Sequence, residues 1–513
     1  MSTANRVIKN TGWLYAKMAI TMFVSLYTTR LILNGLGASD FGIFNIVGGA
    51  IAMLGFLNAA MAGATQRFMS YAEGEGNKEK QKYIFNISVV LHAAISVIIA
   101  IALIIAGYFF FNGILNIPGE RINAAKVVYA SLIVSTMLTV INVPYDAVMN
   151  AHENMKYYAV VGILESLLKL SVAFACVYTA YDKLIVYGIL MACIPLVTLT
   201  IMKIYCHRHY EECVINPVKY WDKSLIKEMT SFGGWNLATS MGTILGNYGN
   251  GIVLNNFFGT ILNAALGISG QLNGMLLVFS NNMLKALNPV IVKKEGEGNH
   301  ARMIDYSYTG CKFSFLLFAV FCLPCFVEAP YILKLWLKNY PEWTVLFVRY
   351  QIVRTLLEQL TITLGISLSA TGKIKEVSIA SFFLNLQPLL VLSLAFYNGA
   401  SPDWFFPIVI FFMVLLTTAV RLYYCRKYCQ LSIIHFNRKV ILPCVFVCLV
   451  LLSIGGCVNL FMANGVMRLF VNIIVMTLFF LPVSWTILNN EERAVLIKLK
   501  EKIQSTFKTR LSK

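Results

Sequence analysis

Long apolar segments alternate with short polar segments along almost the whole chain. Most apolar segments hold about twenty or more residues, and a helix of that length, rising 1.5 Å per residue, crosses a hydrocarbon core about 30 Å thick. Helices of a large soluble protein would show polar positions at a helical period, whereas a segment such as 96–111 shows none. We therefore predict an all-α integral membrane protein with about fourteen transmembrane helices. They are expected near residues 10–34, 41–70, 84–110, 123–149, 157–180, 183–206, 232–257, 261–291, 308–327, 343–370, 376–396, 403–424, 440–459 and 467–489.

The chain also repeats itself at one fixed spacing. The pentapeptide Glu73–Asn77 recurs as Glu295–Asn299, and Gly12–Trp13 recurs as Gly234–Trp235, so both recurrences are 222 residues apart (295 − 73 and 234 − 12). Without any gap, the same spacing pairs Ala16 with Ala238, Asn34 with Asn256, Gly37 with Gly259, Gly48 with Gly270 and Met61 with Met283. We infer a tandem duplication, which in a membrane protein favours a transporter because two similar halves can move around a site between them.

The duplication predicts the domain organisation. Six helices separate equivalent points of the two copies, and this even number gives both copies the same orientation across the membrane. We expect a first six-helix lobe at 1–206 and a second at 207–430, whose cytoplasmic linker at 207–228 is a candidate amphipathic segment on the membrane surface. Two further transmembrane helices at 431–489 and a basic cytoplasmic tail at 490–513 follow.

Composition and charge support a membrane protein and suggest its orientation. Hydrophobic residues make up 58% of the chain, charged residues only 13%, and the mean hydropathy is +0.69. The net charge of +18 lies mostly in alternate loops, on the side of the N-terminus. By the positive-inside rule both termini should be cytoplasmic, and topology explains the charge better than nucleic-acid binding does. The twelve cysteines lie mostly in predicted helices or cytoplasmic loops, so we expect neither a disulfide framework nor a metal site.

Several stretches then resemble a known family. These are residues 26–42 (LYTTRLILNGLGASDFG), Pro144–Ala147 and Ala151–Met155, together with the two parallel six-helix lobes and the two extra C-terminal helices. They resemble bacterial O-antigen and capsule flippases of the multidrug, oligosaccharidyl-lipid and polysaccharide (MOP) exporter superfamily. The resemblance implies a V-shaped, MATE-like pair of lobes around a central cavity that opens alternately to either side of the membrane.

The same resemblance implies a function and partners. The expected activity is translocation of undecaprenyl-pyrophosphate-linked oligosaccharide units, as used for lipopolysaccharide O-antigen, from the cytoplasmic to the periplasmic leaflet of the bacterial inner membrane. The implied partners are the lipid-linked oligosaccharide, membrane lipids, and polysaccharide polymerases and glycosyltransferases. Neither nucleic acid nor a cofactor is expected, and coupling to H⁺ or Na⁺ is a hypothesis.

Ionisable side chains inside the predicted helices are candidate site residues, because each costs about 2.5–3.5 kcal/mol on insertion. Helices one, two, seven and eight line the cavity in the resembled family, so Lys17, Arg30, Arg67 and Lys285 are the candidates for binding pyrophosphate. Alternatives stay open. Arg30 can snorkel to the outer interface, and Arg67 and Lys285 can anchor their helices at the inner one.

Two acid–base pairs have a spacing of four residues. Glu165 with Lys169, and Arg354 with Glu358, lie on one helix face each, so either pair can be a structural ion pair. Alternatively, Glu358 or Glu165 carries a proton or binds sodium during transport. We favour Glu358, since an acid in the tenth helix resembles the cation sites of drug exporters in this superfamily.

Paired aromatic and amide residues are candidate sugar contacts. These are Trp13 with Trp235 and Asn34 with Asn256, although helix packing explains them equally well.

Competing functions are a multidrug and toxin extrusion cation antiporter, a lipid II flippase, and a membrane-bound polymerase or acyltransferase. Exporters of cationic drugs generally have acidic groups in the cavity of the N-terminal lobe, whereas the first helix here carries Lys17 and Arg30 and no acid. Because the six histidines are scattered and no large loop gathers catalytic groups, we expect a protein that is not an enzyme.

Overall fold

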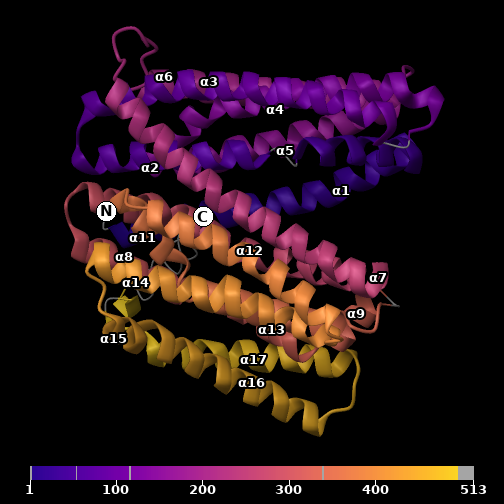
Figure 1. Cartoon of the computed structure of the whole chain (residues 1–513), viewed down its shortest axis with the longest axis vertical. Helices are drawn as coiled ribbons and strands as arrows, with labels where there is room; N and C mark the ends of the chain where they lie inside the picture. The colour runs from indigo at the N-terminus through magenta and orange to yellow at the C-terminus, as the bar shows by residue number, and fades with distance from the viewer. Residues whose placement is uncertain (1–2, 53–54, 115–116, 338–339, 491, 495–513) are drawn as a thin grey trace, which may run out of the picture. The chain divides into compact units, whose positions relative to one another are not determined.

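The chain folds almost entirely into helices. The computed structural model describes residues 3–52, 55–114, 117–337, 340–490 and 492–494, and this described part contains no strand. All fourteen predicted segments fall on helices, as expected where hydrocarbon offers backbone groups no other hydrogen-bonding partner. The all-α membrane fold is thus confirmed (Figure 1).

The first nine helices are α1 (Thr3–Ala52), α2 (Gly55–Glu75), α3 (Lys78–Phe109), α4 (Ile122–Ala151), α5 (Met155–Tyr178), α6 (Lys183–His209), α7 (Lys223–Gly296), α8 (His300–Val327) and α9 (Ala329–Leu337). The others are α10 (Thr344–Gln359), α11 (Ile362–Thr371), α12 (Lys375–Tyr397), α13 (Phe405–Val409), α14 (Thr417–Cys429), α15 (Ile433–Phe436), α16 (Leu442–Phe461) and α17 (Val466–Ile487). Ten uninterrupted helical stretches of the described chain are long and apolar enough to cross a membrane. The predicted helices at 41–70 and 343–370 are each divided between two elements, α1 with α2 and α10 with α11.

The backbone repeats the duplication seen in the sequence. Both α1 and α7 consist of two helices that meet at a glycine, Gly37 with φ 79° and Gly259 with φ 78°. A side chain is strained at such positive φ, so glycine is required at both positions. Downstream, Asn77 and Asn299 each cap the following helix by accepting a backbone N–H, from Lys80 and Arg302 respectively. Both equivalences have the 222-residue spacing, so the two copies share local conformation as well as sequence.

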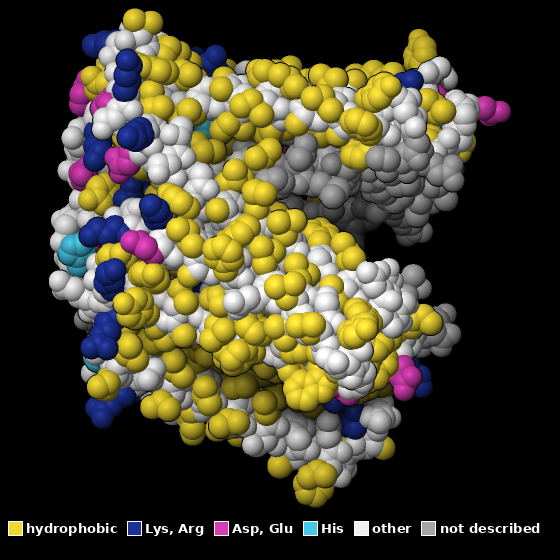
Figure 2. Space-filling model, viewed as in Figure 1, with side chains coloured by type: hydrophobic (Ala, Val, Ile, Leu, Met, Phe, Trp, Pro, Cys, Tyr) yellow, Lys and Arg dark blue, Asp and Glu magenta, His cyan; other side chains and the backbone are white. Residues whose placement is uncertain are grey.

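The contacts divide the chain into two compact units. The N-terminal unit comprises Asn10–Leu237 and Gly296–Gly298, and the C-terminal unit comprises Met1–Lys9, Ala238–Glu295 and Asn299–Lys513. In each unit the Lys and Arg side chains visible in Figure 2 gather mainly at one end of the helices, and apolar side chains cover much of the helix surface between the ends. This distribution suits helices that are surrounded by lipid.

In the N-terminal unit, α4 is the central helix. It packs against α2, α3, α5 and α6, and its first half contributes Ala124, Val128 and Ile133 to an apolar core. Arg121, just before α4, forms hydrogen-bonded ion pairs with both Asp40 of α1 and Asp182 at the start of α6, and so connects three helices at one end of the unit.

In the C-terminal unit, α8 is the central helix. Its apolar stretch is 72% buried, compared with 22–33% for α12, α14, α16 and α17, which therefore lie at the lipid-facing surface. Two buried ion pairs hold the α17 region to α8. At one end Lys312 Nζ lies 2.8 Å from Glu492, and at the other Arg468 Nε lies 2.8 Å from Glu328. The two extra helices α16 and α17 thus form part of this unit (Figure 1).

Candidate functional site

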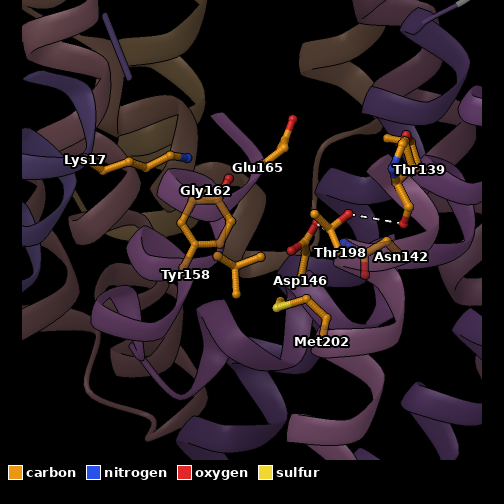
Figure 3. A pocket seen from close by; sticks show the side chains of 11 residues that line it. Lys17, Thr139, Asn142, Asp146, Tyr158, Gly162, Glu165, Thr198 and Met202 are labelled. Atoms are coloured by element: carbon orange, nitrogen blue, oxygen red, sulfur yellow. Dashed lines mark hydrogen bonds between the residues drawn. The ribbon is translucent and has the colours of Figure 1, made fainter. Parts of the chain in front are cut away.

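A polar cavity of about 160 Å³ lies among the helices of the N-terminal unit. Its walls come from α1, α4, α5 and α6, and Figure 3 shows their side chains converging on one space. The lining residues are Lys17 from α1, Thr139, Asn142 and Asp146 from α4, Tyr158, Val161, Gly162 and Glu165 from α5, and Pro195, Thr198 and Met202 from α6. Ligand pockets for drug-sized molecules measure roughly 300–1,000 Å³, so this cavity suits one charged group or an ion.

Lys17 is the basic residue of the cavity, and two residues of α5 set its position. Its Nζ lies 4.5 Å from the centre of the Tyr158 ring, which favours the charged ammonium through a cation–π interaction. Gly162, one turn along α5, leaves the space that the end of the lysine chain occupies. Figure 3 shows the ammonium pointing toward Tyr158. Lys17, predicted from sequence, is thus held inside the helix bundle and not at its lipid-facing surface.

Two carboxylates share this cavity with Lys17. Asp146 accepts a hydrogen bond from Asn142, whose Nδ2 lies 3.2 Å from Oδ2 of the acid. The buried Oδ1 of Asn142 has no hydrogen-bonding partner in the described part of the chain, so it can accept a bond from a bound group. Glu165 lines the cavity as well, and its Oε1 lies 2.6 Å from Lys169 Nζ. The site therefore combines one cation with two acids.

Both pairs with a four-residue spacing form the ion pairs that this spacing favours. Besides Glu165 with Lys169, Arg354 Nε in α10 donates to Glu358 Oε1 at 3.1 Å. Arg354 also donates to Asn247 of α7 at 3.2 Å. Glu358 is thus balanced by a cation within its own helix, and its proposed role in coupling stays a prediction.

Arg67, another predicted pyrophosphate ligand, is enclosed by aromatic rings. It is buried in α2, and its Cζ lies 4.6, 5.0 and 5.3 Å from the ring centres of Phe68, Tyr71 and Phe232. Glu228, at the start of α7, is 3.9 Å from its Nη1. These contacts connect α2 to the first turns of α7 and give Arg67 a structural role. If Arg67 also binds an anion, it must do so without losing these contacts.

The other predicted residues lie elsewhere. Lys285 is half-buried in the second part of α7, within the C-terminal unit. Trp13 and Trp235 are half-buried and Asn256 is exposed, and Lys156 Nζ lies 5.7 Å from the Trp13 ring. The side chains of Arg30 and Asn34 lie outside the described residues. The roles of all these residues stay predictions.

Sequence reasoning missed three residues that the structure brings into polar sites. Asp146 and Tyr158 line the cavity, and Arg421 of α14 donates to the carbonyl and hydroxyl oxygens of Thr361, both at 3.0 Å, where α10 ends and α11 begins. Asp146 and Arg421 could have been predicted in the same way as Lys17, because each is an ionisable residue inside an apolar segment. Tyr158 had none, because a tyrosine in a membrane helix is common.

The sequence of the chain matches one known protein family. The family model described as polysaccharide biosynthesis protein matches residues 7–294. Curated protein sequences give no match.

Solved structures show the same fold. A crystal structure of a mutant MATE protein superposes with a TM-score of 0.71 at 15% identity and covers 84% of this chain and 97% of that one. An outward-facing multidrug resistance MATE family transporter of the MOP superfamily gives 0.70 at 15% identity, covering 84% and 96%. A MOP superfamily transporter from Pyrococcus furiosus, described as having a binding pocket of reverse polarity that suggests a different function, gives 0.70 at 14% identity, covering 84% and 98%. The family match and the MATE-like fold confirm the recognition made from sequence.

Proposed function

We propose, because the chain belongs to the polysaccharide biosynthesis protein family, that this MOP-superfamily transporter flips undecaprenyl-pyrophosphate-linked oligosaccharide units across the bacterial inner membrane. The direction is from the cytoplasmic to the periplasmic leaflet. The tandem duplication supports alternating access, since two similar halves can open a site first to one side of the membrane and then to the other.

The observation that carries this proposal is the Lys17 ammonium inside the polar cavity of the N-terminal unit. A charged lysine within a membrane-spanning bundle is costly unless opposite charge or a polar partner compensates it. A pyrophosphate supplies two adjacent anionic groups that bind an ammonium strongly where the local dielectric is low. Because the cavity is small, it takes the pyrophosphate end of the substrate, and the sugars lie outside it.

The acids of the cavity support coupling of transport to an ion. Asp146, Glu165 and Tyr158 all line the cavity that holds Lys17. A phosphate that binds Lys17 competes with these carboxylates for the ammonium. We infer that a carboxylate takes up a proton or a sodium ion during this exchange, and Glu358 and Glu165 are the candidates for that acid.

The test is transport by purified protein in proteoliposomes loaded with a lipid-linked oligosaccharide. Lys17→Ala should lower flipping by about tenfold to a hundredfold, the effect of losing a charged hydrogen bond that contributes about 1.5–3 kcal/mol. Lys17→Arg should keep part of the activity because it keeps the charge. Lys126→Ala, an exposed lysine of α4, is the matched control and should flip normally. Normal flipping by Lys17→Ala would remove Lys17 from the site, and export of a cationic dye without flipping would favour the drug antiporter.

A further inference from the structure

The segment between α6 and α7, residues 210–222 and called the linker below, exposes four apolar side chains. Val214 and Ile215 are each 47% exposed, Trp221 is 48% exposed, and Val218 is 91% exposed. All four lie outside the membrane-spanning helices. Exposure of several apolar side chains in one short segment is unfavourable in water and marks a contact surface.

The linker has a defined position because its other face is bound to α3. Asn86 Nδ2 donates to the carbonyl oxygen of Val214 at 2.8 Å, and its Oδ1 accepts from the Asn216 N–H at 2.7 Å. The Tyr220 ring packs edge-on against Tyr83, with ring centres 5.4 Å apart. The linker forms turns and not a helix, so its amphipathic character comes from these anchors and not from a helical period.

The linker continues a surface that faces lipid. The outer face of α6 exposes Leu196, Val197 and Ile204, and Ile204 lies five residues before the end of this helix at His209. The linker starts at the next residue. In Figure 1 it stands out from the N-terminal unit beyond α3 and α6, and Figure 2 shows apolar and basic side chains together at this corner.

Basic side chains surround the exposed apolar ones. Lys203, Arg208, Lys219, Lys223 and Lys227 are exposed, and the exposed acids of the same region are Glu211, Asp222 and Glu228. Two of these acids have local roles, because Asp222 accepts the Ser224 N–H at the start of α7 and Glu228 faces Arg67. The surface therefore has an excess of available positive charge.

We propose that the linker docks on an anionic phospholipid surface. Val218 and Trp221 insert at the boundary between headgroups and acyl chains, and the neighbouring lysines contact lipid phosphates. A soluble protein partner would also cover apolar side chains, but the continuity with the lipid-facing side of α6 and the excess of basic residues favour lipid. Docking holds the start of α7 at a set depth in the membrane. The proposal is independent of the transported substrate.

The experiment places a photo-crosslinker in the full-length protein in nanodiscs. Val218→p-benzoylphenylalanine should give several-fold more phospholipid adduct, identified by mass spectrometry, than Glu79→p-benzoylphenylalanine, an exposed position in the first turn of α3. Replacing anionic phosphatidylglycerol with phosphatidylcholine should lower the adduct at 218. Salt at 1 M, where the Debye length is about 3 Å, should lower it too.

Charge variants test whether the lysines near the linker contact lipid phosphates. The triple variant Lys219→Glu, Lys223→Glu and Lys227→Glu should reduce the adduct at 218 several-fold in phosphatidylglycerol. Lys126→Glu, an exposed lysine at the far end of α4, should not. Equal yields of lipid adduct at positions 218 and 79 would overturn the proposal. Crosslinking of position 218 to protein alone, with no lipid adduct, would overturn it as well. The comparison of positions 218 and 79 uses the protein with its native lysines. It therefore tests lipid docking even if the triple variant fails to fold.

Discussion

A Cβ atom placed on Gly162 would overlap Cε of Lys17 and would lie 2.6 Å from its Nζ. The lysine of α1 thus occupies the space that a side chain at Gly162 in α5 would fill. The absence of that side chain is what allows the ammonium to reach the Tyr158 ring.

The first prediction is that Gly162→Ala displaces Lys17 and lowers transport. The end of a lysine chain is flexible, so we expect a loss of stability of at most about 1 kcal/mol, the low end of the range for overpacking. Flipping in proteoliposomes and thermal unfolding in detergent measure the two effects. Gly12→Ala in α1, where no atom lies within 4 Å of the added Cβ, is the control. Full activity of Gly162→Ala would show that the position of Lys17 does not matter.

The second prediction concerns Arg354 and Glu358. If their ion pair is structural, Glu358→Gln leaves a cation without its acid and lowers stability, and the double variant with Arg354→Gln regains folded yield and flipping. If Glu358 instead carries the coupling ion, the double variant regains yield while transport stays uncoupled from the ion gradient. A double-mutant cycle that measures yield and flipping separates the two outcomes.

Third, the buried pair of Glu328 and Arg468 should dominate the attachment of α17. Asn472 also donates to Glu328, at 2.6 Å, so the carboxylate has three hydrogen bonds. Arg468→Ala leaves this buried carboxylate without its cationic partner and should lower the free energy of unfolding by about 3–5 kcal/mol. Lys82→Ala, which removes an ion pair with the mostly exposed Glu79, should cost less than about 1 kcal/mol. Similar losses in the two variants would contradict the prediction.

Fourth, Glu212 in the linker should make stability depend on acidic pH. Burial raises the pKa of this carboxyl, but its hydrogen bond with His152 and the charge of that histidine outweigh burial and leave the pKa below the ordinary value of 4.5. A lowered pKa in the folded state adds stability above the ordinary value, and this stability is lost as pH falls through the folded pKa. Glu212→Gln should therefore flatten the loss of stability as the pH falls below about 5. Glu211→Gln, an exposed neighbour, is the control and should leave the acid limb steep.

The fifth prediction is the orientation expected from the positive-inside rule. Reporter fusions after Glu75, Glu297 and Lys513 should all report the cytoplasm. Glu75 and Glu297 hold equivalent positions in the two copies, whereas Lys513 lies outside the described residues. A periplasmic signal from any of the three would contradict the fourteen-helix topology.

The helices, the duplication and the two ion pairs of four-residue spacing could all be predicted from the sequence. The helices and the ion pairs follow from local physics, and the duplication is visible as a repeat at one fixed spacing. Backbone groups in hydrocarbon must be satisfied within their own segment, and residues four apart meet on one helix face. The paired glycines Gly37 and Gly259, both at positive φ, likewise stand at the repeat spacing in the sequence.

Which polar groups meet could not be predicted from the sequence and is seen in the fold. Lys17 contacts Tyr158 and Gly162 on a helix more than a hundred residues away, and Asp146 reaches the same cavity from a third helix. Arg67, also a candidate for binding pyrophosphate in the sequence, is enclosed by aromatic rings. The physical reason is that a membrane helix is apolar nearly all round, so its sequence does not show which face meets a neighbour. That face is set by how side chains from several helices pack together.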